Sequence, residues 1–282
     1  MKRSIILLFT ALMPLACLFA DTYHDTFVTY MDSYAAINPK ALTTVFAMQA
    51  ERRFPGQPQK TDSVVKEYIE SQLKADLVEF YEPFYRKHVS EQELVELTAI
   101  QSDPRHAQLT QKSREIMRTW NQSALYQGFS NQLEKAINDI KNNKTPTDLP
   151  LPQNVSPEYV EAFNRFYEAS GISDMVANMQ TSALQMLTIQ LYMSGVENAD
   201  KLADSLSDFY QRNTRTVLVS LYSQSFTLDD LTYMAQEVQS DAFQHSSEAM
   251  KEAAGPWGTG IGLSKYFLKW LYANYPMPDE AK

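Results

Sequence analysis

Apolar residues recur every three or four positions along most of the chain, which is the pattern of amphipathic α-helices. The pattern is clearest in a stretch that occurs twice, from about Ser63 to Met117 and from about Asp200 to Met250. Each copy predicts a helix with an aromatic end, a short polar turn and a second helix. Because such a hairpin cannot bury its apolar face alone, the copies are expected to pack together with approximate twofold symmetry. We therefore predict an all-α fold, a multi-helix bundle of two repeated helical-hairpin halves.

The two copies match where the second helix of each hairpin begins. Ser90 and Glu93 have the spacing of a capping box, and Thr227 and Asp230 repeat it with a shorter acidic side chain. One extra residue in the second copy then places Gln239-Ser240-Asp241 on Gln101-Ser102-Asp103. The matched positions share one sequence offset and are Tyr85 with Tyr222, Val89 with Phe226, Ser90 with Thr227, Leu94 with Leu231, and Leu97 with Met234.

Breaks in the helical pattern divide the chain into parts. Residues 142–157 contain four prolines among polar residues and predict an extended, proline-rich linker. We therefore expect a first helical repeat domain at 21–141, a second at 158–254, and a C-terminal amphipathic helix within 255–282. Long single helices are expected from Thr61 to His88 and from Arg105 to Lys141, the latter with a possible division at Gly128.

The first twenty residues have the layout of a secretory signal peptide. Lys2 and Arg3 precede a short apolar run, and Ala20 offers a small residue for cleavage before a polar segment. The alternative is a lipoprotein signal that uses Cys17, the only cysteine of the chain. The sequence thus predicts a periplasmic or secreted protein with cleavage after Ala20.

Charge and composition narrow the classes of partner. Loss of Lys2 and Arg3 with residues 1–20 reduces the 25 basic residues to 23, against 34 acidic residues, and changes the net charge from −9 to −11. Because nucleic acid is negatively charged, this excess of acidic residues argues against nucleic acid as the main partner. No apolar run after the signal peptide is long enough for a transmembrane span. The partner is expected to be a protein or an apolar ligand.

The C-terminal part of the chain has two features with alternative interpretations. Leu263 to Tyr275 is sharply amphipathic and is expected to pack over the repeats, although such a face could also dock on a partner or a membrane. The glycines from Gly255 to Gly262 predict a break before this helix rather than a phosphate-binding loop. Upstream, methionines form one helical stripe, which predicts core packing, with a soft-metal site or an adaptable surface as alternatives. They are Met175, Met179, Met186 and Met193.

Candidate catalytic chemistry is sparse. The chain has four histidines, and none has the paired helical spacing of zinc enzymes. His106 and His245 follow Asp103 and Asp241 at nearly matching points of the two copies, so an Asp–His cluster formed only in three dimensions is one hypothesis. Surface or capping histidines are the other interpretation. No metal site and no cofactor is predicted.

The repeated stretch resembles a known family. The segment Val78 to Leu94, with Tyr85, Val89-Ser90 and Glu91-Gln92-Glu93, is similar to the signature of the bacterial domain of unknown function 2059 family, and Phe226 to Leu231 matches the same pattern. That signature reads tyrosine, a basic spacer, phenylalanine–threonine, acidic residues and leucine. Members usually continue with serine–proline–glycine, whereas this chain has Ser102-Asp103-Pro104 without the glycine. The resemblance implies an exported helical protein, and it carries no functional residue because the family has no established activity.

Two classes of function follow from the sequence. The first is a non-catalytic binding or envelope-associated protein that uses a helical groove or the aromatic C-terminal face. The second is a hydrolase with a site around Asp103, His106, Asp241 and His245.

Overall fold

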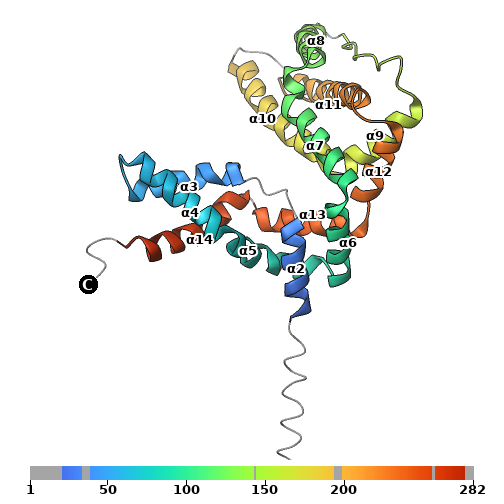
Figure 1. Ribbon diagram of the computed structural model, residues 1–282. Helices are drawn as coiled ribbons and strands as arrows, with labels where there is room; N and C mark the ends of the chain where they lie inside the picture. Colours follow the sequence, from blue (N-terminus) through green and yellow to red (C-terminus); the bar gives the residue numbers. More distant parts are fainter. Residues whose placement is uncertain (1–20, 34–38, 143, 194–198, 256–257, 277–282) are drawn as a thin grey trace, which may run out of the picture. The chain divides into compact units, whose positions relative to one another are not determined.

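The computed structural model describes residues 21–33, 39–142, 144–193, 199–255 and 258–276. Within these ranges the chain forms 13 α-helices and one short 3-10 helix, and no described residue lies in a β-strand (Figure 1). The prediction of an all-α fold is therefore confirmed. The predicted signal peptide lies outside the described residues. None of the described helices combines the length and the apolar character that crossing a membrane requires.

The chain divides into two compact units, which are described separately. The first consists of residues 1–102 together with 241–282, and the second of residues 103–240. The division differs from the predicted one, because the segment 142–157 lies inside the second unit instead of between two halves. The chain passes from one unit to the other within the two matching Gln-Ser-Asp triplets. The helix that follows the first triplet therefore packs in the second unit, with the hairpin of the second copy. The helix that follows the second triplet packs in the first unit, with the hairpin of the first copy.

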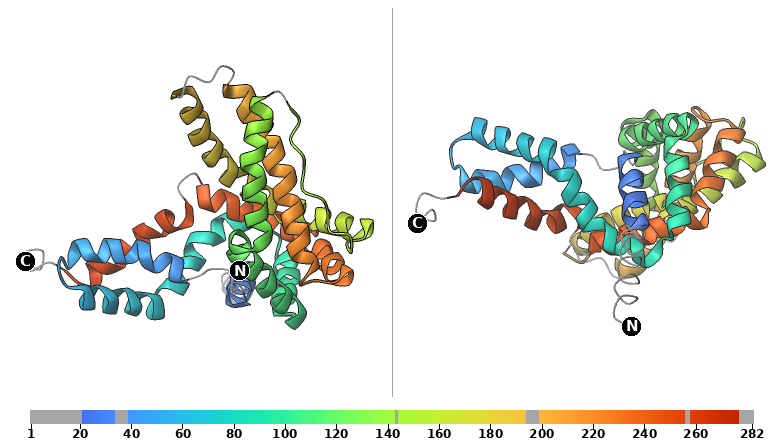
Figure 2. Two further views of the ribbon diagram at one scale, coloured as in Figure 1. Left: turned by 90° about the horizontal axis from the view of Figure 1, so that it is seen from above. Right: turned by 60° about the horizontal axis from the view of Figure 1, so that its bottom comes forward.

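The first unit is built around buried aromatic side chains. Helix α2 lies against α5 and α6, α13 packs on α5 and α6, and α14 covers α3 and α5 (Figure 2). Tyr68, Tyr81 and Phe267 are almost completely buried between these helices. The helices of this unit are α2 (Thr22–Ser33), α3 (Pro39–Arg53), α4 (Pro58–Ser71), α5 (Leu73–His88), α6 (Glu91–Ser102), α13 (Asp241–Ala254) and α14 (Gly258–Asn274).

The second unit has its own aromatic core. Helix α9 packs on α12, and α11 lies between α8 and α10, in contact with both. Phe129, Phe163, Phe209 and Tyr222 are almost completely buried. Its helices are α7 (Pro104–Thr119), the 3-10 helix η1 (Trp120–Gln122), α8 (Ala124–Lys141), α9 (Pro157–Ala169), α10 (Ile172–Met193), α11 (Ala199–Ser223) and α12 (Leu228–Val238).

Matched residues of the two predicted copies make matching contacts, each within its own unit. The Tyr23 hydroxyl donates to the Val89 carbonyl oxygen at 3.0 Å, and the Tyr159 hydroxyl donates to the Phe226 carbonyl oxygen at 3.2 Å. Val89 and Phe226 are a matched pair. The duplication itself stays a prediction, and these contacts support it.

Two predicted long helices are each divided in the structure. The first ends at Ser71, and α5 begins at Leu73, where the buried carboxylate of Asp76 accepts hydrogen bonds from Tyr68 and Gln72. The second is interrupted by η1, after which the Ser123 hydroxyl caps α8 by accepting the Tyr126 N–H at 3.1 Å. Gly128 does not divide this helix but lies inside it. The sequence pattern missed both breaks because apolar periodicity continues across them.

The break predicted from Gly255 to Gly262 is shorter than expected, since α13 ends at Ala254 and α14 already begins at Gly258. A Cβ atom on Gly262 would lie 2.8 Å from the ring of Phe80, so glycine here permits close packing of α14 on α5. The side chains of Leu263 and Phe267 are completely buried. The apolar face of the C-terminal helix therefore belongs to the core of the first unit and is not free to dock on a partner.

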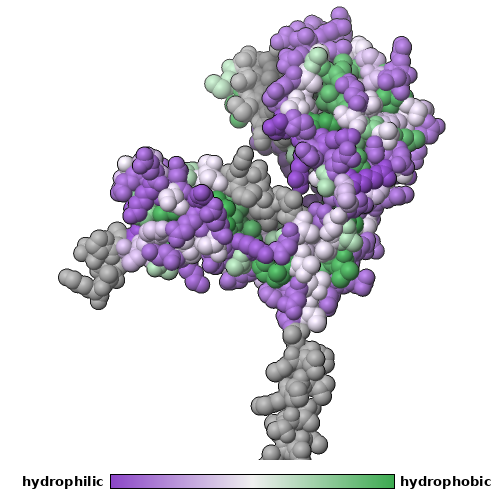
Figure 3. Space-filling model, viewed as in Figure 1, coloured by the Kyte–Doolittle hydropathy of each residue, from purple (hydrophilic) through white to green (hydrophobic). Residues whose placement is uncertain are grey.

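The methionine stripe of α10 also differs from the prediction. Met175 is 40% exposed and Met193 is 84% exposed, so core packing is wrong for these two residues. The side chains of Met179 and Met186 lie outside the described set. Figure 3 shows that hydrophilic residues cover most of the visible surface of the described chain, with smaller apolar patches among them.

Candidate functional site

The predicted pair Asp103 and His106 lies in the second unit, at the start of α7. Asp103 caps this helix by accepting the Arg105 N–H at 2.8 Å, and it also accepts the Tyr233 hydroxyl of α12 at 2.7 Å. His106 Nδ1 lies 2.9 Å from a carboxylate oxygen of Glu237, and its Nε2 lies 3.3 Å from the Thr110 hydroxyl. Both side chains thus connect α7 to α12.

Hydrogen bonds and burial at this contact shift the pKa values of Asp103 and Tyr233. The Tyr233 hydroxyl, assisted by the Arg105 N–H, holds the pKa of Asp103 below its usual value. Burial raises the pKa of Tyr233 well above its usual range, and the carboxylates of Glu237 and Asp103 raise it further. The Arg105 guanidinium lies 4.5 Å from the centre of the Tyr233 ring and is bonded to Asp229 at 2.6 Å. Asp103, Arg105 and Glu237 are therefore each paired with an opposite charge or a hydrogen-bonding group of a neighbouring side chain.

The other predicted pair, Asp241 and His245, lies in the first unit. Asp241 opens α13 and is exposed. His245 Nδ1 lies 2.7 Å from Glu93, the acidic member of the capping box on α6. The four residues of the predicted hydrolase site are thus divided between the two units, and each of its histidines is paired with a glutamate of its own unit.

Every histidine of the chain is paired in this way with a glutamate of another helix. No group of three or more His, Cys, Asp or Glu side chains in the described part of the chain is arranged to hold a metal ion. The pairs are His24 with Glu82, His88 with Glu252, His106 with Glu237, and His245 with Glu93, at distances between 2.6 and 2.9 Å.

Three of the open grooves formed by described residues are candidate binding sites. They differ in the partners of the polar and charged side chains that line them. In the groove between α2 and α5, His24 is paired with Glu82 and Lys74 with Asp32, and the exposed Glu79 has no ion pair with a described residue. A second groove, between residues 140–146 and α11, is lined by Arg212, which is paired with Asp148. The third groove, between α3 and α4, is lined by the carboxylates of Glu51 and Asp62, which pair with no described residue, and by Thr61, whose buried hydroxyl has no described hydrogen-bond partner. We take it as the candidate site because of Thr61.

The α3–α4 groove arises from the helical repeat of α3. Leu42, Phe46 and Ala50 point into the core of the first unit. Thr43, Ala47 and Glu51 each follow one residue later, about 100° further round the helix, and so line the groove. A tight turn, in which Gly56 adopts a φ of 71°, then returns the chain so that α4 lies beside α3.

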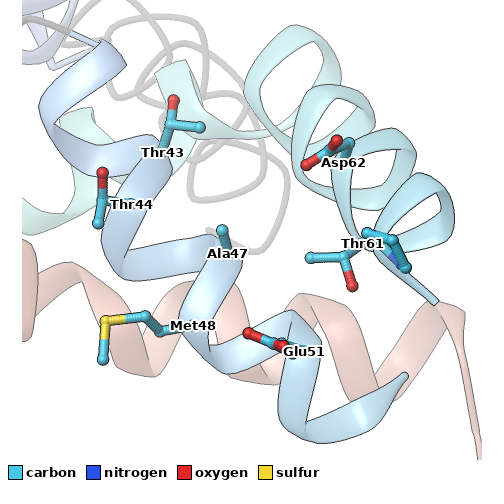
Figure 4. A pocket seen from close by; sticks show the side chains of 8 residues that line it. Thr43, Thr44, Ala47, Met48, Glu51, Thr61 and Asp62 are labelled. Atoms are coloured by element: carbon cyan, nitrogen blue, oxygen red, sulfur yellow. The ribbon is translucent and has the colours of Figure 1, made fainter. Parts of the chain in front are cut away.

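The groove has a volume of about 450 Å³, within the range of small-ligand sites. Figure 4 shows Thr61 and Asp62 extending from α4 on the side that faces α3, with Ala47 and Glu51 across from them. Met48 is 60% exposed and adds an apolar side chain to the α3 wall. The lining residues are Thr43, Thr44, Ala47, Met48, Glu51, Pro58, Thr61 and Asp62.

Thr61 is the unusual member of this lining. The residue is only 6% exposed, and its hydroxyl oxygen has no hydrogen-bond partner among the described residues. A buried hydroxyl without a partner costs about 1–3 kcal/mol. Thr214, in α11, is likewise buried with a hydroxyl that has no described hydrogen-bond partner. Several other helical threonines avoid this cost by donating to the carbonyl oxygen four residues earlier. They are Thr26, Thr29, Thr98, Thr119, Thr181, Thr216 and Thr232.

The sequence interpretation missed this groove. The residues Thr43-Thr44 and Thr61-Asp62 are a polar face on helices with a clear apolar face, and such a face is usually only solvated. Their distinguishing property is that two helices bring them to one opening and leave the Thr61 hydroxyl buried without a bond. That property depends on the packing and gives no signal in the sequence.

Comparison of the chain with family models, with curated proteins and with solved structures found no match. The resemblance to the 2059 family accordingly stays a prediction that rests on its two motifs.

Proposed function

We propose that the protein is exported and acts as a non-catalytic binding protein whose ligand lies in the α3–α4 groove. Export rests on the signal-like sequence of residues 1–20 and places the protein in the periplasm or outside the cell. The observation that carries the binding site is Thr61, whose side chain lines the groove and whose buried hydroxyl has no partner among the described residues. A ligand that bonds to this hydroxyl would remove the cost of its burial.

The experiment is a titration with n-hexanol, followed by amide signals in ¹H–¹⁵N NMR spectra. The amide signals of α3 and α4 are expected to shift in a saturable way, with dissociation constants in the millimolar range typical of so small a ligand. Ala47→Trp fills the groove and is expected to abolish the shifts. Ala107→Trp, at an exposed position of the second unit, is the control and should leave them unchanged. Shifts that persist in Ala47→Trp would contradict the assignment of this groove.

A hydrolase remains the second candidate function, and one arrangement in the second unit favours it. Thr110, His106 and Glu237 form a chain of hydroxyl, imidazole and carboxylate, with distances of 3.3 Å and 2.9 Å. This is the order in which an activated nucleophile, a general base and an orienting acid are placed. His106 would take the proton of the Thr110 hydroxyl as its oxygen attacks an ester carbonyl, and then pass that proton to the leaving alcohol. A water molecule that gives a proton to His106 would then cleave the acyl-threonine ester, and that proton would return to the Thr110 oxygen.

Hydrolysis of p-nitrophenyl acetate tests this candidate. If the array is catalytic, His106→Gln should abolish the activity, whereas His88→Gln, which alters another histidine–glutamate pair, should leave it unchanged. Equal rates for both variants would remove the hydrolase from consideration.

A further inference from the structure

The charges of the α3–α4 groove indicate the chemistry of its ligand. Glu51 and Asp62 are exposed carboxylates that form no ion pair or hydrogen bond with any described residue. Three basic residues lie near them in the sequence, and none forms an ion pair with either carboxylate; Arg52, next to Glu51, is exposed. Arg53 donates to the Tyr275 carbonyl oxygen, and the ammonium group of Lys60 lies 4.7 Å from the centre of the Phe54 ring.

Oxygen atoms that can accept hydrogen bonds therefore gather in one opening. The two carboxylates can only accept when ionised, and the buried hydroxyl of Thr61 has lone pairs that no group of the chain uses. A primary ammonium group has three N–H donors and no acceptor. Its donors and its charge complement the Glu51, Thr61 and Asp62 oxygens, whereas an anionic ligand would be repelled by both carboxylates.

The remainder of the lining is suited to an apolar chain. Ala47 and Met48 form part of the α3 wall, and Pro58 lies at the start of α4. Methionine side chains are flexible and polarisable, so they adapt to unbranched hydrocarbon chains. A ligand with an ammonium group and a short methylene chain would contact both the polar and the apolar parts of the groove.

We infer that the α3–α4 groove binds a primary ammonium group carried on an unbranched apolar chain. This inference rests on the proposed function, because it names the ligand class of the same site. Two sources share this chemistry, namely a free alkylamine and the lysine side chain of a peptide.

Matched six-carbon ligands test the inference. n-Hexylamine, n-hexanol and hexanoate are titrated separately at pH 7 and low ionic strength, with the NMR signals of α3 and α4 as the readout. The amine is expected to bind about fivefold tighter than the alcohol and to lose this advantage at high salt, since exposed carboxylates each contribute a modest, screened attraction. Glu51→Gln and Asp62→Asn should each weaken amine binding by about threefold and leave hexanol binding unchanged. Glu70→Gln, an exposed carboxylate of α4 outside the groove, is the control.

The outcomes separate the inference from the proposed function. Equal binding of the three ligands, blocked by Ala47→Trp, would overturn the ammonium inference and leave the groove as a binding site. No shift of α3 and α4 signals with any ligand would overturn both. The source is then identified with acetyl-Ala-Lys-Ala-amide. Binding at least as tight as that of hexylamine indicates a lysine-bearing peptide, and weaker binding indicates a free alkylamine.

Discussion

Tyr85 and Ser246, which are 161 positions apart in the sequence, share a buried hydrogen bond in which their oxygen atoms are 2.9 Å apart. The Tyr30 hydroxyl lies 3.2 Å from that of Tyr85, so three hydroxyls of α2, α5 and α13 meet in the core of the first unit. The matched residue of Tyr85 in the second copy, Tyr222, makes the same kind of contact with Ser113 at 2.7 Å. In each unit, a tyrosine at the end of a hairpin helix thus holds a helix that belongs to the other copy.

Removal of the Tyr85 hydroxyl is expected to destabilise the first unit. Tyr85→Phe leaves the Ser246 hydroxyl with fewer partners in the core, and the free energy of unfolding should fall by about 1–3 kcal/mol in urea titrations. Tyr272→Phe, at a residue that is 50% exposed, is the matched control and should change it by less than about 0.5 kcal/mol. If Ser246→Ala cost as much in the Tyr85→Phe background as alone, the two hydroxyls would not be coupled.

Two glycines inside helices should respond in opposite ways to replacement by alanine. Gly262→Ala places a Cβ atom 2.8 Å from the Phe80 ring, and the overpacking is expected to cost about 1–3 kcal/mol. Gly128→Ala meets no atom within 4 Å and should stabilise α8 by about 0.5–1 kcal/mol, because alanine is the better helix former. Thermal unfolding of both variants measures the difference, and stabilisation by Gly262→Ala would contradict the close packing of α14 on α5.

The unpartnered hydroxyl of Thr61 predicts a variant that is more stable but binds less well. Thr61→Val keeps the shape of the side chain and removes the buried oxygen, so the free energy of unfolding is expected to rise by about 1 kcal/mol. The same variant should weaken amine binding in the groove. The control is Thr119→Val, which removes a hydroxyl that donates to the Glu115 carbonyl oxygen at 2.8 Å and should not stabilise the protein. A loss of stability in Thr61→Val would show that the hydroxyl has a partner.

Acid should destabilise the helix starts that are held by carboxylates. The backbone N–H of Ser90 and the side chains of Ser90 and His245 lower the pKa of Glu93. A carboxyl group whose pKa is lower in the folded state stabilises the fold above its unfolded pKa of about 4.3, and this contribution is lost as the pH falls through the folded value. The urea midpoint is therefore expected to fall steadily from about pH 5 to pH 3. Glu93→Gln should make that fall less steep, and an unchanged slope would contradict the assigned role of Glu93.

The proline-rich segment is expected to be protected by one buried asparagine. Asn213 is completely buried, accepts the Leu149 N–H and donates to Asp148 at 3.0 Å, which fixes residues 148–149 against α11. Asn213→Ala removes both contacts and should increase the rate of tryptic cleavage after Lys144 severalfold. Asn131→Ala, at an exposed position, is the control and should be cleaved at the original rate. Equal rates would show that the segment is held by other contacts.

The helix starts could be read from the sequence alone. The capping boxes of Ser90 with Glu93 and of Thr227 with Asp230 are present as predicted, and Ser156 caps α9 ahead of a proline in the first helical position. These features join residues within four positions of one another, so local spacing is sufficient to specify them. Helical periodicity, a local property of the same kind, likewise predicted an all-α chain.

Only the tertiary structure decided what covers each helix face. The pattern showed that Leu263 and Phe267 share an apolar face, but whether this face met the core or a partner depended on α3 and α5, more than 170 positions earlier. The same holds for Gly262, whose role appears only when Phe80 lies against it, and for Thr61, whose hydroxyl is left without a described partner once the first unit has packed. Contacts between distant segments depend on which faces meet, and a periodic sequence specifies a face without specifying its neighbour.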